Sequence, residues 1–244
     1  MVEKGNDTVA FIYDFDGTLS PDNMQEYGFI KAIGKNAEEF WAENARLSNE
    51  NDASNILCYM YLMIKMAKNN DISLKRESFQ RFGKDVELFE GVKDWFARIN
   101  DYGRSKGLDV KHYIISSGLK EMIEGTSIAR AGAFERIYAS SFMFDSKGVA
   151  VWPAQAINYT NKTQFLFRIE KGVLDINDSG VNDHFEPEDV RVPFRNIVYI
   201  GDSATDIPCM KMVKEKGGKS IAVYAAGKSE TVKPLVDDDR INYV

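Results

Sequence analysis

The chain has 244 residues, enough for one sizeable domain or for one domain with a smaller insert. Its composition, with 44% hydrophobic and 28% charged residues, is that of an ordinary globular protein and argues against widespread disorder. The formal net charge of −6 argues against a nucleic-acid-binding face, because such a face needs a dense basic surface.

The first predicted element is a buried strand, VAFIY at residues 9–13. It follows an N-terminal stretch, MVEKGNDTVAF, that lacks the long apolar core of a signal peptide. The strand leads directly into DFDGT, where Asp14 and Asp16 point the same way if the backbone stays extended. Two carboxylates on one face repel each other, so the pair predicts a positively charged partner between them.

The stretch between this strand and the next, roughly residues 21–109, is too long for a simple crossover connection. Its middle has helical patterns, and a return helix, LFEGVKDWFARINDYG, begins from about Leu88. We therefore predict a small α-helical cap at residues 21–87, inserted into a core made of residues 1–20 and 88–244.

Three helical segments make up the predicted cap: AEEFWAENARL, DASNILCYMYLMIKMAKNN and SLKRESFQRFG. We expect Asp52 or Ser54 as the N-cap of the second, and Ser73 and Gly83 as the start and stop signals of the third. The most apolar run, at residues 56–64, is well short of the roughly 20 residues of a membrane span, so no membrane contact is expected.

Four further apolar runs are typical of buried strands: residues 110–116, 136–140, 196–200 and 219–224. Most are followed by a turn signal and a helical pattern, which is the rhythm of βαβ units. The sequence therefore predicts an α/β fold with a Rossmann-like parallel sheet, whose ligands gather at the carboxyl ends of its strands. A polar, acidic stretch at 172–196 is expected to run over the surface.

Two groups suited to an anion follow in this second half. Ser116, Ser117 and Gly118 end the second strand, and we expect them to open a helix whose free N–H groups attract a phosphate. Lys162 opens another predicted helix and offers a compact positive charge, although a lone lysine in such a composition is more often solvated.

A second carboxylate pair follows the fourth strand in YIGDSATDIPCM, with Asp202 at the strand end and Asp206 at the mouth of a helix. Pro208 suits the first turn of that helix. If the first and fourth strands are neighbours, these two side chains converge with Asp14 and Asp16. Four carboxylates in one crevice need a cation, and oxygen ligands without His or Cys favour Mg²⁺. Because Mg²⁺ commonly binds phosphate oxygens as well, a phosphate group is the expected ligand.

Each motif alone has a simpler explanation, since Asp and Gly are common in turns and Asp is a common helix cap. All of them would then have to fall by chance at strand ends of one sheet, in an order that makes one site. Cys58 and Cys209 lie far apart in no metal-ligand spacing, so we expect both to be reduced and buried in a cytoplasmic protein.

In this order the motifs resemble the haloacid dehalogenase superfamily, specifically its phosphoserine-phosphatase-like phosphatases. DFDGT at residues 14–18 resembles the first motif, Ser116 the second, Lys162 the third and GDSATD at 201–206 the fourth. The insert is similar to the helical cap of the class that carries its cap between the first two motifs.

The resemblance implies that Asp14 is the nucleophile that forms an aspartyl-phosphate and that Asp16 is the general acid and base. It implies Mg²⁺ held by the side chains of Asp14 and Asp202 and by the backbone carbonyl of Asp16. The remaining implied roles are phosphoryl binding by the N–H groups around Phe15 and Ser117, by Ser116 and by Lys162, and support from Thr18 beside Asp16, from Gly118, and from Asp206, which would orient water or Lys162.

An acid at Asp16 favours a phosphoesterase or phosphomutase over a dehalogenase, because an alkoxide leaving group needs a proton. Relatives acting on phosphoserine carry a Glu shortly after the first motif, where this chain has Asn23, although Glu26 is close. We therefore predict a small phosphorylated metabolite as substrate. Candidate contacts for its distal end are Arg46, Arg76, Arg81 and Lys65, each of which is explained better as solvated surface.

Two other functions stay open at this stage. A phosphomutase would use the same aspartyl-phosphate and return the group to a sugar, and a catalytically silent protein would keep the fold for partner recognition. Loss of one of the four aspartates would be the usual sign of the second, and none is lost here. The sequence does not distinguish a monomer from a homodimer.

Overall fold

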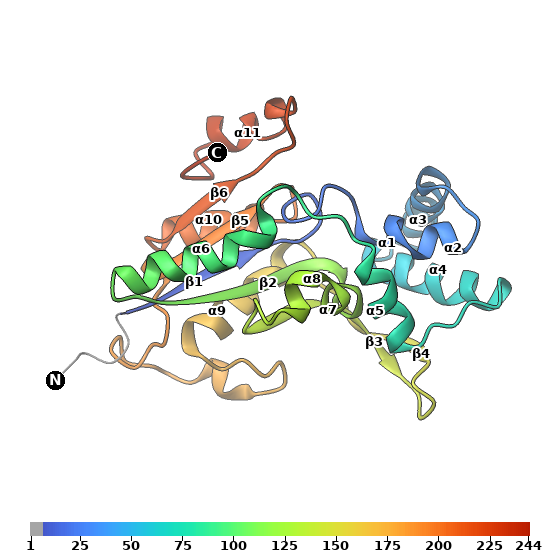
Figure 1. Ribbon diagram of the computed structural model, residues 1–244, viewed down its shortest axis with the longest axis horizontal. Helices are drawn as coiled ribbons and strands as arrows, with labels where there is room; N and C mark the ends of the chain where they lie inside the picture. The colour runs from blue at the N-terminus through green and yellow to red at the C-terminus, as the bar shows by residue number, and fades with distance from the viewer. Residues whose placement is uncertain (1–6) are drawn as a thin grey trace.

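A computed structural model describes residues 7–244 and shows a six-stranded sheet with helices on both faces (Figure 1). The prediction that the chain begins without a signal peptide rests largely on residues 1–6, which lie outside the described residues. The strand order is β4-β3-β2-β1-β5-β6. The strands are β1 (Thr8–Tyr13), β2 (Asp109–Leu119), β3 (Arg136–Phe144), β4 (Ala150–Gln155), β5 (Ile197–Gly201) and β6 (Lys219–Ala222).

The five predicted strands are confirmed, and they pair in parallel. The sequence missed β4, which pairs antiparallel with β3. Its sequence, AVWPAQ, contains Pro153 and is mostly exposed, as suits an edge strand but not the buried apolar run that identified the other strands.

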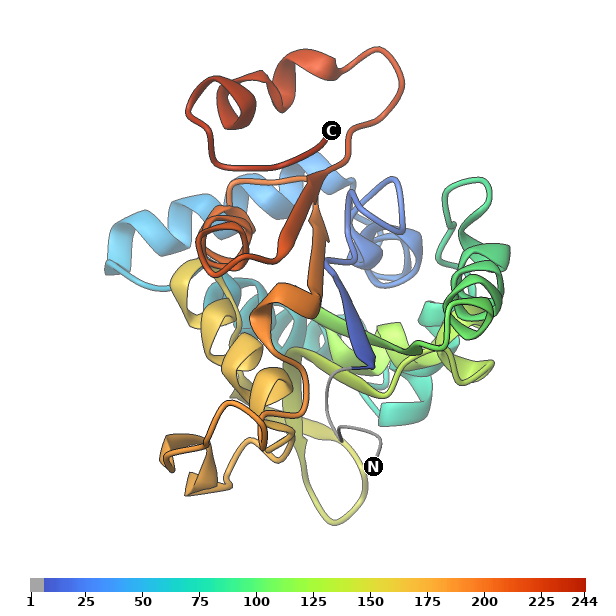
Figure 2. The ribbon, with the colours of Figure 1, turned by 90° about the vertical axis from the view of Figure 1, so that its left-hand side faces the viewer.

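Helices cover the two faces of the sheet, as Figure 2 shows. The alternating side chains of β1 define the two faces: Tyr13 packs edge-on against Phe96 of α6, whereas Ile12 lies in a separate apolar cluster with Phe165 and Val213. The first face is covered by α6 (Val92–Ser105) among other helices, and α9 (Thr163–Lys171) and α10 (Ile207–Glu215) lie on the second.

Five helices occupy the chain between β1 and α6 and gather beyond one end of the sheet (Figure 1). Their apolar side chains, such as Phe40 and Met60, belong to the same buried cluster as Leu119 and Met122 next to the sheet. The division of residues 21–87 from the rest as a cap domain stays a prediction. The five helices are α1 (Met24–Tyr27), α2 (Phe29–Ala32), α3 (Ala37–Asn51), α4 (Asn55–Asn69) and α5 (Arg76–Lys84).

The ends of α5 differ from the prediction. Ser73 is not its N-cap, because α5 begins at Arg76 and residues 74–75 before it stay extended against the β3–β4 hairpin: Ala150 N donates to Leu74 O and Arg76 N to Gly148 O. Gly83 is not a stop signal either, since it lies inside the helix. Ser54 does precede α4 at the N-cap position, as predicted.

The stretch at residues 172–196 runs over the surface, as predicted, and Arg168 of α9 holds part of it. The guanidinium group donates to the backbone oxygens of Asp175, Ile176 and Asp178. The remaining elements are α7 (Lys120–Gly125), α8 (Ser127–Arg130), α11 (Lys233–Asp237) and the 3₁₀ turns Tyr159–Lys162, Ser179–Asn182, Phe194–Asn196 and Ser229–Thr231.

Cys58 and Cys209 are both buried and unpaired, which confirms their predicted state within the described part of the chain. No helix among residues 7–244 combines the length and the apolar character that crossing a membrane requires.

Candidate active site

The site lies where the strand order reverses. The chain proceeds from β1 to β2 and β3 on one side and returns to β5 on the other side of β1, so a crevice opens at the carboxyl ends of β1 and β5. Asp14 follows β1 and Asp202 follows β5. The ends of these two strands are joined by a hydrogen bond of 2.9 Å from Asp14 N to Ile200 O. Both residues line a cavity of about 410 Å³.

The turn after β1 brings the backbone close to Asp202. Gly17 has a φ of +77°, and a Cβ atom there would lie 2.2 Å from Asp202 Oδ2. Glycine is therefore required at this position both by the left-handed backbone and by the approach to the carboxylate. The glycine that the sequence placed in a turn motif thus lets two distant strand ends meet.

Three carboxylates come together in this crevice: oxygen atoms of Asp14, Asp202 and Asp206 all lie within 4.8 Å of one another. Burial, followed by the charge of Asp206, raises the pKa of Asp14 to about 7, although Lys162 opposes the shift. The same two causes raise the pKa of Asp202 to about 6. The site thus stores electrostatic repulsion that a cation would relieve, and its oxygen-only donors fit a hard divalent ion.

Asp206 is fully buried and uses both of its oxygens within the protein. Oδ1 accepts from Lys162 Nζ at 2.8 Å and from the Tyr199 hydroxyl at 2.7 Å, while Oδ2 accepts from the Ser203 N–H and hydroxyl. It does not cap α10 with its side chain, although Pro208 does lie in the first turn of that helix as predicted. Asp206 therefore holds the ammonium group of Lys162 and the hydroxyl groups of Tyr199 and Ser203 in place.

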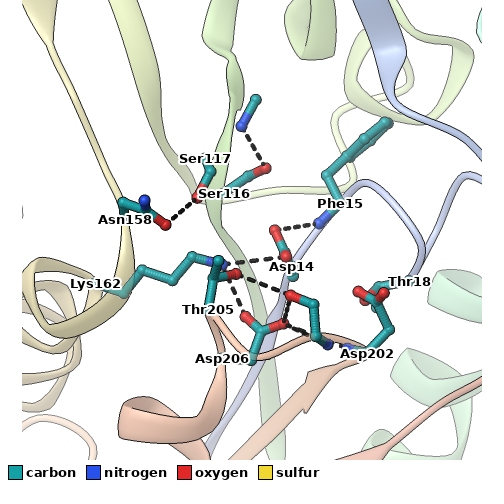
Figure 3. Close-up of polar contacts among 12 residues, drawn as sticks. Asp14, Phe15, Thr18, Ser116, Ser117, Asn158, Lys162, Asp202, Thr205 and Asp206 are labelled. Atoms are coloured by element: carbon teal, nitrogen blue, oxygen red, sulfur yellow. Dashed lines mark hydrogen bonds and ion pairs between the residues drawn. The ribbon is translucent and has the colours of Figure 1, made fainter. Parts of the chain in front are cut away.

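Lys162 is a positive partner of Asp14, but the second carboxylate that it contacts is Asp206 rather than the predicted Asp16. Its side chain is completely buried and lies 3.1 Å from Asp14 Oδ2 in addition to its bond with Asp206 (Figure 3). Burial alone would lower the pKa of this lysine, but Asp14 and Asp206 outweigh burial and raise it above its ordinary value. The expectation that a lone lysine is solvated is wrong for this residue.

Asp16 lies beside Asp14 with its carboxylate held by the helical segment. Met24 N, at the start of α1, donates to Asp16 Oδ1 at 2.9 Å. Burial first, and the charge of Asp14 second, raise the pKa of Asp16 well above its ordinary value, which favours the protonated acid. Thr18 was expected to steady Asp16 but instead donates to Asp202 Oδ1 at 3.1 Å, because the turn at Gly17 carries it toward β5.

The predicted phosphoryl-binding groups lie at the end of β2, on the same cavity. Ser116, Ser117 and Gly118 belong to the strand and do not open a helix, since β2 continues to Leu119; Ser116 Oγ accepts from Gly118 N at 3.0 Å. This corrects the predicted helix N-terminus. The N–H of Phe15 donates to Asp14 Oδ1 at 2.7 Å.

The outer wall of the cavity comes mostly from residues that the sequence did not identify. Tyr59 of α4 donates to Ser117 O at 2.9 Å, and Asn158 donates to Asn55 at 3.0 Å, so the helical segment is bonded to the core across the crevice. These residues have no motif, and their role depends on how the helices fold back onto the sheet. The other wall residues that were not predicted individually are Pro21, Asp22, Gln25, Trp41, Asn44 and Ile56, together with Ser203 and Thr205 of the GDSATD motif.

The four basic residues considered for the distal end of a substrate are not among the described residues that line the cavity. Arg46 pairs with Glu43 and Glu50 on the surface of α3, and Arg76 stacks on Phe144. Arg81 donates to Ser78 and Lys65 lies over the ring of Tyr61, so the interpretation as surface residues is confirmed.

Comparison with known proteins gives a family model, described as haloacid dehalogenase-like hydrolase, that matches residues 11–211. An uncharacterised protein of Borreliella burgdorferi is 25% identical over 99% of this chain and 91% of its own length. A HAD family hydrolase structure from Salmonella enterica serovar Typhi has a TM-score of 0.62 and 18% identity, over 94% of this chain and 66% of its own.

A phosphoserine phosphohydrolase-like protein from Francisella tularensis has a TM-score of 0.57 and 21% identity. That match covers 93% of this chain and 92% of the Francisella chain. At these identities the two solved structures show a shared fold.

Proposed function

Because the chain belongs to the haloacid dehalogenase-like hydrolase family, we propose that it is a Mg²⁺-dependent phosphatase that hydrolyses a small-molecule phosphomonoester through an aspartyl-phosphate on Asp14. The observation that carries the proposal is the buried contact of Lys162 with both Asp14 and Asp206 beside Asp202, on a cavity large enough for a small metabolite. The carboxylate that would attack phosphorus, the positive charge that would hold the phosphoryl oxygens and the proposed cation site are then neighbours.

In the first half of the proposed reaction, a carboxylate oxygen of Asp14 attacks phosphorus, and the bond from phosphorus to the alcohol oxygen breaks. Asp16 gives its proton to the departing alcohol, and its raised pKa supports this role because it favours the protonated acid. Lys162 and the hydroxyl of Ser116 hold phosphoryl oxygens as negative charge develops on them.

In the second half, Asp16 takes a proton from a water molecule whose oxygen attacks the phosphorus. The bond between phosphorus and the Asp14 oxygen breaks, which releases inorganic phosphate and restores the carboxylate of Asp14. Asp206 positions Lys162 throughout, since its bond to Nζ of 2.8 Å fixes the ammonium group beside Asp14.

Mg²⁺ is the cation that we propose, because it prefers a few carboxylates together with water and phosphate oxygens. The side chains of Asp14 and Asp202 and the backbone carbonyl of Asp16 would hold it. When bound, the ion neutralises carboxylate charge and polarises phosphoryl oxygens.

The proposal includes a small phosphorylated metabolite as partner, with no nucleic acid and no membrane, in the cytoplasm. The enclosing wall supports a small substrate, since Tyr59 and Asn158 bond across the crevice. Whether the protein works as a monomer or a homodimer stays open.

Substitution of Asp14 tests the proposal directly. We expect Asp14→Asn to reduce Mg²⁺-dependent phosphate release from p-nitrophenyl phosphate by about 10³-fold or more, because an amide does not attack phosphorus. The matched control is Asp189→Asn, on an exposed loop, which should keep full activity. EDTA should silence the wild-type enzyme and Mg²⁺ should restore it.

Full activity of Asp14→Asn, with unchanged circular dichroism, would reject the nucleophile. The same assay separates the two alternatives from the proposal. A phosphomutase would convert a phosphosugar into its isomer without releasing phosphate, and a silent binding protein would release none from any ester in a panel of phosphorylated metabolites.

A further inference from the structure

The part of the cavity away from Asp14 has an unusual chemical character, because amide side chains make up much of its wall. They come from α1 and the turn before it, from α3, from the start of α4, and from the segment that precedes Lys162. These amides are Asn23, Gln25, Asn44, Asn55 and Asn158.

No lysine, arginine or histidine is among the described residues that line this cavity. Lys162 lies behind Asp14, with its side chain completely buried between two carboxylates. A carboxylate on the substrate would therefore lose water without gaining a cationic partner, which is costly in an enclosed site.

An ammonium group on the substrate is matched no better. Glu26, the acid closest to the position that holds an amino group in relatives acting on phosphoserine, already accepts from Trp41 Nε1 at 2.9 Å and from Asn23 Nδ2 at 2.8 Å. It does not line the cavity in the described structure. Asp22 lines the rim but is exposed and accepts from the hydroxyl of Tyr27.

Two of the amides lack partners for their oxygen atoms. Gln25 is 2% exposed and Asn44 is 6% exposed, and Gln25 Oε1 and Asn44 Oδ1 are buried without a hydrogen bond. Buried polar atoms are normally paired, and exchanging the oxygen and nitrogen of either amide would leave an unpaired donor in place of an acceptor. Hydroxyl groups suit both cases, because a hydroxyl donates and accepts.

Aromatic surface completes the wall. Trp41 and Tyr59 meet edge to face with their ring centroids 6.0 Å apart, and both line the cavity. Their polar atoms are already used, by Glu26 and by Ser117 O, so the rings offer mainly apolar surface to a ligand. The carbon face of a sugar or polyol packs against such a surface while its hydroxyl groups reach the amides.

We infer that the alcohol released by this enzyme is uncharged and hydroxylated, so that the substrate is a phosphorylated sugar or polyol that carries neither a carboxylate nor an amine. This inference rests on the proposed function and deepens it by naming the class of the leaving group. Gln25 and Asn44 are the specificity-determining residues, because both line the cavity and their buried amide oxygens have no hydrogen-bond partner in the described structure.

A pair of substrates that differ in one group tests the inference on the wild-type chain. Glycerol 3-phosphate and 3-phosphoglycerate share a three-carbon skeleton and a central hydroxyl, and they differ in a hydroxymethyl group against a carboxylate. We expect kcat/KM to be at least about tenfold higher for glycerol 3-phosphate, since the carboxylate stays unpaired. Phosphoethanolamine, with an ammonium group, should also be about tenfold poorer. A kcat/KM ratio near one, or a preference for 3-phosphoglycerate or phosphoethanolamine over glycerol 3-phosphate, overturns the inference.

Substitutions then locate the effect. Gln25→Met and Asn44→Leu remove the amides at similar volume, and each should lower the preference for glycerol 3-phosphate over p-nitrophenyl phosphate by about tenfold. Asn49→Leu, at an exposed position of the same helix as Asn44, is the matched control and should leave the preference unchanged. Equal preferences in all three variants would show that the amides do not select the substrate.

Asn55→Lys provides a reverse test that does not depend on burial, because Asn55 is exposed at the rim. The added ammonium group should raise kcat/KM for 3-phosphoglycerate several-fold relative to glycerol 3-phosphate. If that ratio stays the same or falls, the lack of a cation in the cavity wall is not the cause of the selectivity. Hydrolysis of p-nitrophenyl phosphate separates the two levels: activity on it with no preference between the esters rejects only this inference, whereas inactivity on every ester rejects the proposed function as well.

Discussion

Lys162 brings an ammonium group into contact with two carboxylates, Asp14 and Asp206, that would otherwise face each other in a buried site. Breaking a buried pair by removing one partner is strongly destabilising, because it leaves an uncompensated charge. In this protein the removal would leave two.

Lys162→Met is therefore expected to abolish phosphatase activity and to lower the free energy of unfolding at pH 8 by about 3–5 kcal/mol. The loss should be smaller at pH 5, because protonation of Asp14 removes its repulsion with Asp206. Urea unfolding at the two pH values measures both effects. Lys211→Met, which affects an exposed surface pair, is the control and should change stability by less than about 0.5 kcal/mol. An equal loss at both pH values would show that lost packing, rather than charge, explains the change.

At the scale of elements, α5 and α7 are in direct backbone contact, because glycines at the contact leave no side chains between the two helices. A Cβ atom at Gly83 would lie 2.0 Å from Met122 O, and one at Gly125 would lie 2.1 Å from Gln80 O. Backbone atoms on both sides leave no side chain that can move away. The two helices therefore depend on glycine for their distance.

We expect Gly83→Ala to destabilise the protein by about 1–3 kcal/mol, the usual cost of overpacking. Alanine favours a helix by up to about 1 kcal/mol over glycine, so helix propensity alone would predict the opposite sign. Thermal and urea unfolding decide between them, with Lys84→Ala, at the exposed neighbouring position, as the control. A more stable Gly83→Ala variant would mean that α5 and α7 can separate without cost.

Elements whose signal is local were predicted from the sequence. The strands β1, β2 and β5 are apolar runs bounded by turn residues, and each was predicted within a few residues of its bounds. Failures occur where a distant segment decides: residues 74–75, before α5, stay extended because they pair with the β3–β4 hairpin, and Gly83 lies inside α5, where it contacts α7. The edge strand β4 was missed because it is exposed and contains Pro153.

The candidate site divides in the same way. Asp14, Asp16 and Asp202 follow predicted strands directly, so the parallel sheet alone brings them to one edge. The partner of Thr18 was predicted wrongly, because the direction of its side chain depends on the turn at Gly17. Most residues of the outer wall lie in or next to the five helices between β1 and α6 and carry no motif, because their approach to the crevice depends on how those helices pack.

At the scale of the whole molecule, buried carboxylates link stability to pH. The ordinary pKa of an aspartate is 3.8, and the folded protein raises the pKa of Asp14 to about 7 and that of Asp202 to about 6. The folded state therefore binds protons more tightly than the unfolded state. Its resulting stability is fully present below about pH 4 and is lost as the pH rises through 6 to 7.

The proposed Mg²⁺ ion would replace these protons, so its stabilising effect should grow with pH. We expect the difference in Tm between Mg²⁺ and EDTA to be small at pH 5 and to reach about 6–12 °C at pH 8, equivalent to about 3 kcal/mol. Taking a difference at each pH cancels the titration of groups far from the site. Asp202→Asn should remove most of the difference, and a difference that shrinks as the pH rises would contradict the assigned shifts.

The hydrogen bond from Met24 N to Asp16 Oδ1 couples the position of α1 to the orientation of the Asp16 carboxylate. Met24 begins α1, and Asp16 is the proposed proton donor, so the first residue of this helix also orients the acid. A movement of α1 away from the sheet would break the same bond. Asp16 would then be oriented as a proton donor only while α1 is packed against the sheet, an arrangement that would also shield the proposed aspartyl-phosphate on Asp14 from other nucleophiles.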